Sequence, residues 1–448
     1  MTKHSTTEMK MKFTELAIAT FKRRREGLLT IFDPLQITSK TFMLLRIYES
    51  MYRTDPLKSG LVRLFGENLN LYSSPKVKQQ QRSTRVAVTS TKDTAANRCL
   101  ITNYNRPDFS SGDDFEREDE DEKEMKVWEA GLATAAAPFY FPPFVKAETM
   151  KNYVDGALHA NLPIQYALEE MANLWPNLGS ETLLDALVSV GTGIQRKELD
   201  IPKILEIGGF KQICTNFHNN INTERLWKKL ISNSSYSPEL RHRIHRLNAN
   251  IPNEYVALDD YKKMGAMEDM VARQMEGSTG SPSPLAMNIA KTADILTASL
   301  FFFEPDPLGL ADTNFSGSAT AGRCELKGSI RCRLAKNSQE LKKLLNIVDG
   351  FWKAEIKNAS PSLTPTSLEN NNWTQVKPGN WKNGVKTGGA WFNVDCTIST
   401  HEPTEMQQVI AVSLIPPKEE EQHYSYKPLP ISGFPISFKE LQRKAMST

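Results

Sequence analysis

Hydrophobic and polar residues follow one another in the first half of the chain with the period of amphipathic helices. Apolar side chains recur every three or four residues, which places them on one face of a helix. A basic turn or a proline closes two of these stretches, and both are typical of helix ends. The pattern predicts helices over residues 13–25, 41–52, 60–71, 128–137 and 162–174.

Shorter β-branched and apolar runs between these helices predict strands. Residues 84–91 (TRVAVTST) and 99–104 (CLITNY) are of this type, and residues 183–190 (LLDALVSV) form a mostly apolar run. A nearly continuous apolar strand between helices is typical of a parallel sheet that is covered on both faces. The first half of the chain is therefore predicted to be α/β, with a parallel-sheet core.

The pattern changes along the second half. Residues 200–300 are mainly of helical type, with a break rich in Gly, Ser and Pro at 277–284. After residue 317 the apolar period shortens, and strands are predicted at 324–334, 352–356, 391–398 and 409–415. We therefore expect three regions: an α/β domain at 1–250, a helical extension and linker at 251–316, and a β-rich module at 317–448.

Composition and charge exclude several classes of protein. Hydrophobic residues make up 40% of the 448 positions, which is enough to bury a core, so the chain as a whole is not disordered. The 55 basic and 52 acidic residues leave a net charge of +3, which excludes a nucleic-acid binder that relies on bulk positive charge. Five scattered cysteines without a C-x-x-C pair favour a reducing compartment over a disulfide scaffold or a zinc finger.

The sequence shows neither a secretory signal nor a membrane-spanning segment. Residues 1–12 are polar and charged, unlike the apolar core of a signal peptide. The longest apolar run, at 296–303, is far shorter than the roughly 20 residues that span a bilayer. We therefore expect a cytoplasmic protein whose contact with membranes is at most peripheral.

Three charged segments have plain alternatives to a binding site. Residues 113–124 hold nine acidic and two basic residues, which is typical of a solvated loop, and they lack the spaced pattern of a calcium loop. Basic residues 22–25 form either the last turn of a helix or a nuclear or lipid-facing signal. His242 and His245 could form a metal pair, but no carboxylate or cysteine stands at ligand spacing, which favours a solvated helix face. We expect no metal.

One group of residues is a candidate for catalysis. Asp155 follows the strand-like pair 153–154 and precedes Gly156, so its carboxylate is expected on a tight turn at the end of a strand. Open α/β sheets place their ligands at this edge. A carboxylate there can act as a general base, which contributes roughly 10²–10⁴ in rate. The alternative is that Asp-Gly is simply a frequent turn dipeptide.

The surrounding motifs resemble the C-terminal half of the patatin-like phospholipase domain. An alanine-rich helix runs into residues 137–143 (APFYFPP), which are followed by Asp155-Gly156-Ala157. Residues 160–163 (ANLP) come next, and a strand then ends in residues 189–193 (SVGTG). One such match would be weak, whereas several in the family's order are specific.

The resemblance implies hydrolysis of acyl-lipid esters by a Ser–Asp dyad, without a histidine and without a cofactor. Asp155 matches the catalytic Asp by position. The resemblance further implies that Gly156 keeps the turn open, that Ala157 completes the motif, and that Asn161 and Pro163 brace the entry of the following helix. A phospholipid or another acyl lipid is the expected substrate, and nucleic acid is not an expected partner.

The chain departs from the family pattern at the nucleophile. No G-x-S-x-G occurs in the 448 residues, and the glycine-rich oxyanion loop is missing too. In the family both precede a helix like that at 13–25, so we expect an N-terminally truncated domain whose motif region ends near residue 170. With neither the serine nor the oxyanion donors, no lipase turnover is expected. The alternative is a non-catalytic scaffold that binds lipid or protein.

Overall fold

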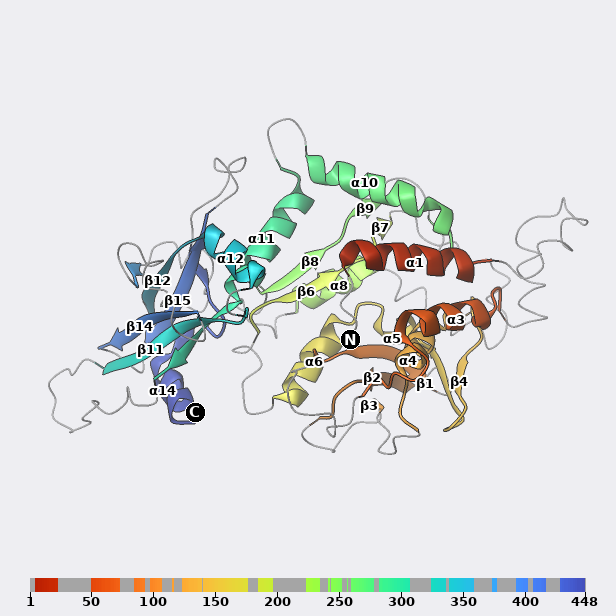
Figure 1. Cartoon of the computed structure of the whole chain (residues 1–448), viewed down its shortest axis with the longest axis horizontal. Helices are drawn as coiled ribbons and strands as arrows, with labels where there is room; N and C mark the ends of the chain where they lie inside the picture. Colours follow the sequence, from red (N-terminus) through yellow and green to blue (C-terminus); the bar gives the residue numbers. More distant parts are fainter. Residues whose placement is uncertain are drawn as a thin grey trace, which may run out of the picture. The chain divides into compact units, whose positions relative to one another are not determined.

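The chain divides into two compact units (Figure 1). Unit 1 comprises Met1–Leu174, Gly193–Ser232 and Asn250–Ala272, and unit 2 comprises Trp175–Thr192, Asn233–Ala249 and Arg273–Thr448. The computed structural model describes residues 5–22, 50–72, 84–92, 97–106, 115–116, 123–138, 140–175, 184–195, 223–233, 241, 243–251, 256, 259–277, 282–306, 324–335, 338–357, 373–376, 392–401, 406–415 and 428–447.

A five-stranded sheet lies in unit 1, with its strands in the order β3-β2-β1-β5-β4. β1 pairs antiparallel with both β2 and β5, β4 pairs antiparallel with β5, and β3 pairs parallel with β2. The strands are β1 (Ala87–Lys92), β2 (Asn97–Thr102), β3 (Phe115–Glu116), β4 (Phe144–Lys146) and β5 (Lys151–Asp155).

The expectation of a parallel-sheet core is wrong for this sheet. Residues 93–96 connect β1 with β2, and residues 147–150 connect β4 with β5. A parallel crossover needs about a dozen residues or more, so these connections can join only antiparallel neighbours. The antiparallel pairing of β1 with β2 and of β4 with β5 therefore follows from the short connections.

Parallel pairing occurs in two shorter strand pairs. The apolar run predicted at 183–190 contains β6, which pairs in parallel with β8 in unit 2, and β7 pairs in parallel with β9 in unit 1. Together with the helices, these pairs agree with the α/β class. The strands are β6 (Leu187–Val190), β7 (Ile194–Gln195), β8 (Ile244–Leu247) and β9 (Asn250–Ile251).

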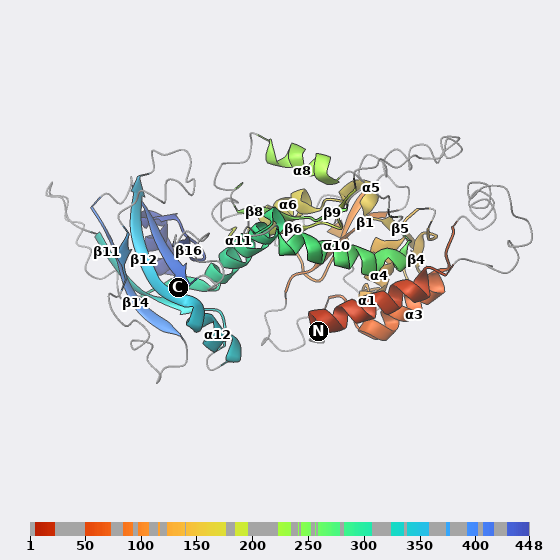
Figure 2. The ribbon, with the colours of Figure 1, turned by 90° about the horizontal axis from the view of Figure 1, so that it is seen from above.

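The helices of unit 1 pack closely against one another. α1 lies beside α3 (Figure 2), where a side chain at Gly60 would overlap Leu16. α3 in turn packs on α4, where Leu61 contacts Gly131. The helices are α1 (Thr6–Thr20), α3 (Thr54–Phe65), α4 (Val127–Ala135), α5 (Ala157–Ala160), α6 (Ile164–Leu174) and α8 (Thr223–Ile231), followed by η3 (Tyr261–Lys263) and α10 (Met264–Glu276), which continues beyond unit 1.

Two predicted helices have different ends because of local backbone chemistry. α1 begins earlier than expected, since the Ser5 hydroxyl caps it by accepting the N–H of Glu8 at 3.2 Å. α3 ends at Gly66, whose φ of 90° a helix cannot continue. The helices predicted at 128–137 and 162–174 are confirmed as α4 and α6, while residues 23–25 and 41–49 lie outside the described residues.

Small residues let α4 lie close to the sheet. Ala130 and Ala133 share a buried cluster with Cys99 and Ile101 of β2 and with Tyr153 of β5. Because alanine carries only a methyl group, the helix backbone approaches the strands closely. The alanine-rich sequence of α4 is thus explained by its contact with the sheet.

An aromatic cluster covers another part of α4. It joins α4 to α3 and to the segment that follows α4, and its rings contact one another edge-to-face, tilted or stacked. Its buried members are Tyr52, Leu57, Leu61, Trp128, Leu132 and Phe141.

The interpretation of residues 113–124 as a solvated loop is wrong at Glu116. This residue lies on β3, and its half-buried side chain accepts hydrogen bonds from Lys92 at 2.9 Å and from Lys151. Burial alone would raise the pKa of Glu116, but the two lysines lower it below the usual value. Residues 117–122 lie outside the described residues.

The solvated helix face predicted around the histidine pair is also wrong. His245 lies on strand β8, beside Val188 of β6, and is only 8% exposed. Pairing with a strand far away in the sequence buries this side chain, which the local charge pattern does not indicate. His242 lies outside the described residues.

Unit 2 contains two antiparallel sheets with a common core. β10, β11 and β14 form one sheet; β13, β12, β15 and β16 form the other, and β17 also pairs with β15. The predicted strands at 324–334, 352–356, 391–398 and 409–415 fall on β11, β12, β14 and β15. The strands are β10 (Phe301–Pro305), β11 (Cys324–Cys332), β12 (Val348–Lys357), β13 (Thr374–Gln375), β14 (Asn393–Thr400), β15 (Met406–Leu414), β16 (Leu429–Pro430) and β17 (Ile436–Ser437).

One hydrophobic cluster fills the space between these sheets and their helices. Phe301, Ile330, Val348 and Ile410 are fully buried in it, and Phe438 joins them from a helix. The helices of unit 2 are α11 (Pro284–Ala298), α12 (Gln339–Ile347) and α14 (Phe438–Ser447). Within the described part of the chain, no helix is both long enough and apolar enough to cross a membrane. The domain boundaries after residues 250 and 316 stay a prediction.

Candidate active site

Asp155 is the last residue of β5, a strand that lies between β1 and β4. It stands opposite Ser90 in the antiparallel register of β1 and β5. Its backbone N–H donates to the carbonyl of Ala136, directly after α4, at 3.0 Å. Three elements, β1, β5 and the end of α4, therefore meet at this residue.

The turn after Asp155 is fixed by its own side chain and by a glycine. One carboxylate oxygen, Oδ1, accepts the N–H of Ala157 at 2.7 Å, so the carboxylate is hydrogen-bonded to the first residue of α5. A Cβ at Gly156 would overlap both the hydroxyl and the carbonyl oxygen of Thr89 on β1. Glycine is needed at this position because of that close approach.

Burial raises the pKa of Asp155 to about 6, while the hydrogen bond from the N–H of Ala157 acts in the opposite direction. Among the described residues, no lysine or arginine forms an ion pair with this carboxylate. A carboxyl group with a pKa near neutrality can accept a proton from a substrate or nucleophile and release it again at physiological pH. The site therefore has the electrostatics of a general base.

The other residues of the predicted motif follow Asp155 in a compact turn. Ala157 begins α5, and Asn161 stands immediately after its last residue. Pro163 directly precedes α6, and its carbonyl accepts the N–H of Ala167 at 3.0 Å. The structure thus brings the motif residues into one strand–turn–helix segment, and their functional roles remain a proposal.

Hydroxyl groups that no motif indicated tie the three elements together. The Ser90 hydroxyl lies 2.8 Å from the carbonyl oxygen of Val154 and 3.2 Å from that of Ala133. The Thr134 hydroxyl donates to the carbonyl of Thr89 at 2.7 Å. The sequence signal for this role is weak, because Ser90 lies in a strand and Thr134 in an alanine-rich helix, without a motif around either.

Ser90 is not placed to serve as a nucleophile. It is 2% exposed, and the single proton of its hydroxyl points toward backbone carbonyl oxygens of β5 and α4. No hydrogen bond joins its hydroxyl to the Asp155 carboxylate. Ser90, which stands opposite Asp155 in the sheet register, is therefore a structural residue.

A buried ion pair holds α6, the helix that follows the motif. The guanidinium of Arg106 binds both carboxylate oxygens of Glu170, at 3.1 Å from Nε to Oε1 and 2.7 Å from Nη2 to Oε2. Burial, with the Glu170 carboxylate nearby, raises the pKa of Tyr104 above its usual range. Planar, bidentate pairs of this kind fix geometry well. The segment after β2 is thereby joined to α6.

Two segments of the chain match family models. Residues 5–168 match the family model described as patatin-like phospholipase, so a patatin-like segment lies at the N-terminal end of this chain. Residues 325–446 match a model described as a domain of unknown function. Residues 189–193, which also resemble the patatin family, lie beyond the matched segment. That the match corresponds to the C-terminal part of the family's domain stays a prediction.

Curated relatives match over short stretches. The chain is 30% identical to "Phospholipase A I" of Arabidopsis thaliana over 120 residues, which is 26% of this chain and 8% of that protein. It is 32% identical to "Calcium-independent phospholipase A2-gamma" of Homo sapiens over 97 residues, or 22% of this chain and 11% of the relative. The rat protein of the same name is 37% identical over 78 residues, 17% of this chain and 9% of the relative. The chain thus spans about a tenth of these relatives.

Proposed function

We propose that the segment around Asp155 is the base-bearing part of a patatin-like lipid acyl hydrolase. The observation that carries the proposal is a half-buried aspartate at a strand end, whose carboxyl group has a pKa of about 6, within a segment that matches the patatin-like family. The named relatives are phospholipases, which favours a phospholipid or another acyl lipid as the substrate.

The proposed chemistry is ester hydrolysis by a Ser–Asp dyad. The Asp155 carboxylate accepts the proton of a serine hydroxyl as the serine oxygen attacks the ester carbonyl, and the alcohol leaves with that proton. Water then hydrolyses the acyl-serine bond, with Asp155 again accepting and returning a proton. Gly156 allows the close contact with β1 that sets this carboxylate at the end of β5.

The serine is the missing part of this chemistry. No G-x-S-x-G segment occurs in the 448 residues, and Ser90 donates to backbone carbonyls. We therefore propose that the chain as given is inactive by itself. A second proposal, a non-catalytic scaffold that binds lipid or protein, is favoured by the same absence of the motif. In either case the protein is proposed to be cytoplasmic, with peripheral contact to lipid.

Hydrolysis of phosphatidylcholine vesicles, measured as fatty acid release, tests the proposal. The chain as given should release no more fatty acid than buffer. Release that disappears in Asp155→Asn but persists in Asp55→Asn, a change to an exposed carboxylate on α3, would show that the chain supplies its own nucleophile. Release that persists in Asp155→Asn would refute the role of Asp155 as the base.

The two proposals differ in the sequence encoded upstream of Met1. An in-frame G-x-G-x-x-G followed by G-x-S-x-G in the transcript favours the hydrolase. A protein that starts at Met1 in the cell, as identified by mass spectrometry of its N-terminal peptide, favours the scaffold. Co-sedimentation of that protein with phosphatidylcholine vesicles then distinguishes lipid binding from protein binding.

A further inference from the structure

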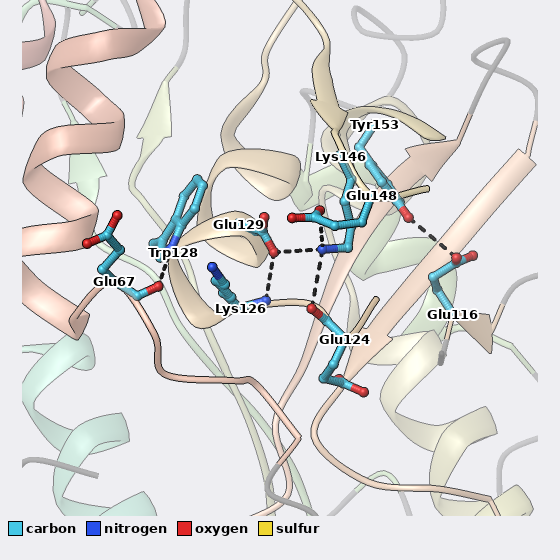
Figure 3. A network of polar contacts seen from close by, with 9 residues as sticks. All are labelled: Glu67, Glu116, Glu124, Lys126, Trp128, Glu129, Lys146, Glu148 and Tyr153. Atoms are coloured by element: carbon cyan, nitrogen blue, oxygen red, sulfur yellow. Dashed lines mark hydrogen bonds and ion pairs between the residues drawn. The ribbon is translucent and has the colours of Figure 1, made fainter. Parts of the chain in front are cut away.

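A buried lysine joins strand β4 to the first turn of α4 (Figure 3). Lys146 is 1% exposed, and its ammonium group donates to the carboxylate of Glu129 at 3.1 Å, to the carbonyl of Glu124 at 3.3 Å and to the carboxylate of Glu148 at 3.0 Å. All three ammonium protons are thereby used. Glu129 is itself 4% exposed, so this is a buried ion pair with one more exposed carboxylate beside it.

The same network fixes the first turn of α4. The Oε2 atom of Glu129 also accepts the backbone N–H of Lys126 at 2.9 Å, which caps the helix. The indole N–H of Trp128 donates to the carbonyl of Glu67 at 3.0 Å. A buried ion pair adds little stability over an apolar pair of similar volume, because desolvation offsets the attraction between the charges. The hydrogen bonds of the pair, in contrast, form only when α4 lies at one position relative to β4.

The other end of α4 meets Asp155. Ala136, directly after the helix, accepts the Asp155 N–H at 3.0 Å. In the antiparallel register of β4 and β5, Lys146 stands opposite Lys151, the first residue of β5. Asp155 is the last residue of β5, so Lys146 and Asp155 lie at opposite ends of this strand. Four strand residues span ~13 Å. The helical rise from Glu129 to Ala136 is ~10 Å. The helix therefore lies along β5 and is attached near both ends of it.

We propose that Lys146 and Glu129 are positioning residues for Asp155: their ion pair sets the place where the end of α4 meets the end of β5, and so limits the access of water to the Asp155 carboxylate. The importance of this position for catalysis rests on the proposed function. The geometric coupling itself does not, and it is measurable without any turnover.

The double variant Lys146→Met/Glu129→Gln tests the coupling. Both side chains stay similar in volume, and the glutamine oxygen still accepts the N–H of Lys126, so the helix cap is kept. Hydrogen exchange of the Asp155 amide, followed by mass spectrometry, should become about tenfold faster because its bond to the Ala136 carbonyl opens more often. A titration of ¹³C-labelled aspartate by NMR, with Asp155→Asn for assignment, should show the pKa falling from about 6 toward 3.8 as water reaches the carboxylate.

Arg106→Met/Glu170→Gln is the matched control. It removes another ion pair of low exposure from the same unit, one that joins the segment after β2 to α6 rather than β4 to α4. This control should leave both Asp155 readouts unchanged even where it lowers stability.

Two outcomes overturn the proposal: unchanged exchange and pKa in the Lys146 double variant, or equal changes in the control. If the double variant does not fold, Glu129→Gln alone removes the charge but keeps one oxygen that can accept from both Lys126 and Lys146, and it should give a smaller change in the same direction. Failure of the proposed function would appear in the vesicle assay and would leave these readouts as predicted.

Discussion

Replacing Asp155 by Asn should make unit 1 more stable at neutral pH. Burial raises the pKa of the Asp155 carboxyl from 3.8 to about 6, so the folded protein holds this ionised group less well than the unfolded chain does. Below pH 3.8 both states are protonated and the group has no effect. As the pH rises from 3.8 to about 6, the unfolded state ionises first and stability is lost. Above pH 6 the loss is constant.

The size of the effect follows from the pKa difference. A shift of about two units corresponds to ~3 kcal/mol in the free energy of unfolding at pH 8. At pH 5 only about half of that loss is present, ~1.6 kcal/mol. Asparagine keeps the oxygen that accepts the Ala157 N–H, but its amide N–H₂ needs partners of its own, which reduces the gain. We expect Asp155→Asn to gain about 1–3 kcal/mol at pH 8 and about 1 kcal/mol less at pH 5.

Urea unfolding at pH 5, 6.5 and 8 measures this gain. Hydrogen exchange of the α4 and β5 peptides serves as the probe of unfolding, so that the signal comes from unit 1. Asp55→Asn removes an exposed carboxylate from the same unit and reports any pH effect that is not specific to Asp155. A gain that does not grow between pH 5 and pH 8, or a loss of stability at pH 8, would refute the reasoning. The carboxyl group would then be hydrated, and its use as a general base near neutral pH would lose its physical support.

Three further substitutions test the packing inside the two units. Gly156→Ala should destabilise unit 1 by about 1–3 kcal/mol, since the added methyl group overlaps Thr89 and forces β1 and β5 apart; an unchanged melting temperature would contradict this contact. Arg106→Met should cost about 3–5 kcal/mol in urea unfolding because the buried Glu170 loses its partner, and adding Glu170→Leu should recover most of the loss, whereas strict additivity would argue against the pair. Phe301→Ala should lower the stability of unit 2 by about 3–5 kcal/mol, seen as loss of protection in its strand peptides, while those of unit 1 stay protected.

Much of the local structure could be predicted from the sequence. The alanine-rich stretch indicated α4, the Asp-Gly pair indicated a turn after a strand, and the shortened period after residue 317 indicated strands in unit 2. These features depend on neighbours only a few residues apart, so local pattern is sufficient for them. The sequence also contained the connections at 93–96 and 147–150, whose length requires antiparallel strands.

Contacts between distant residues were not accessible in this way. Glu116 looked like part of a solvated acidic run, yet Lys92 and Lys151 bind its carboxylate. No sequence motif indicated the buried ion pair of Lys146 with Glu129. The sequence shows which side chains are charged, whereas the burial of a charged side chain depends on the partners that the fold brings next to it.

Asp155 combines both kinds of information. The sequence by itself determined that a carboxylate stands at a strand end before a glycine, because both properties are local. Only the tertiary structure decided that Thr89 requires the glycine, that Ala136 holds the Asp155 backbone, and that burial raises the pKa of its carboxyl to about 6. The physical reason is that a pKa reflects the water and charge around a group, and these are set by segments that the chain brings together only when it folds.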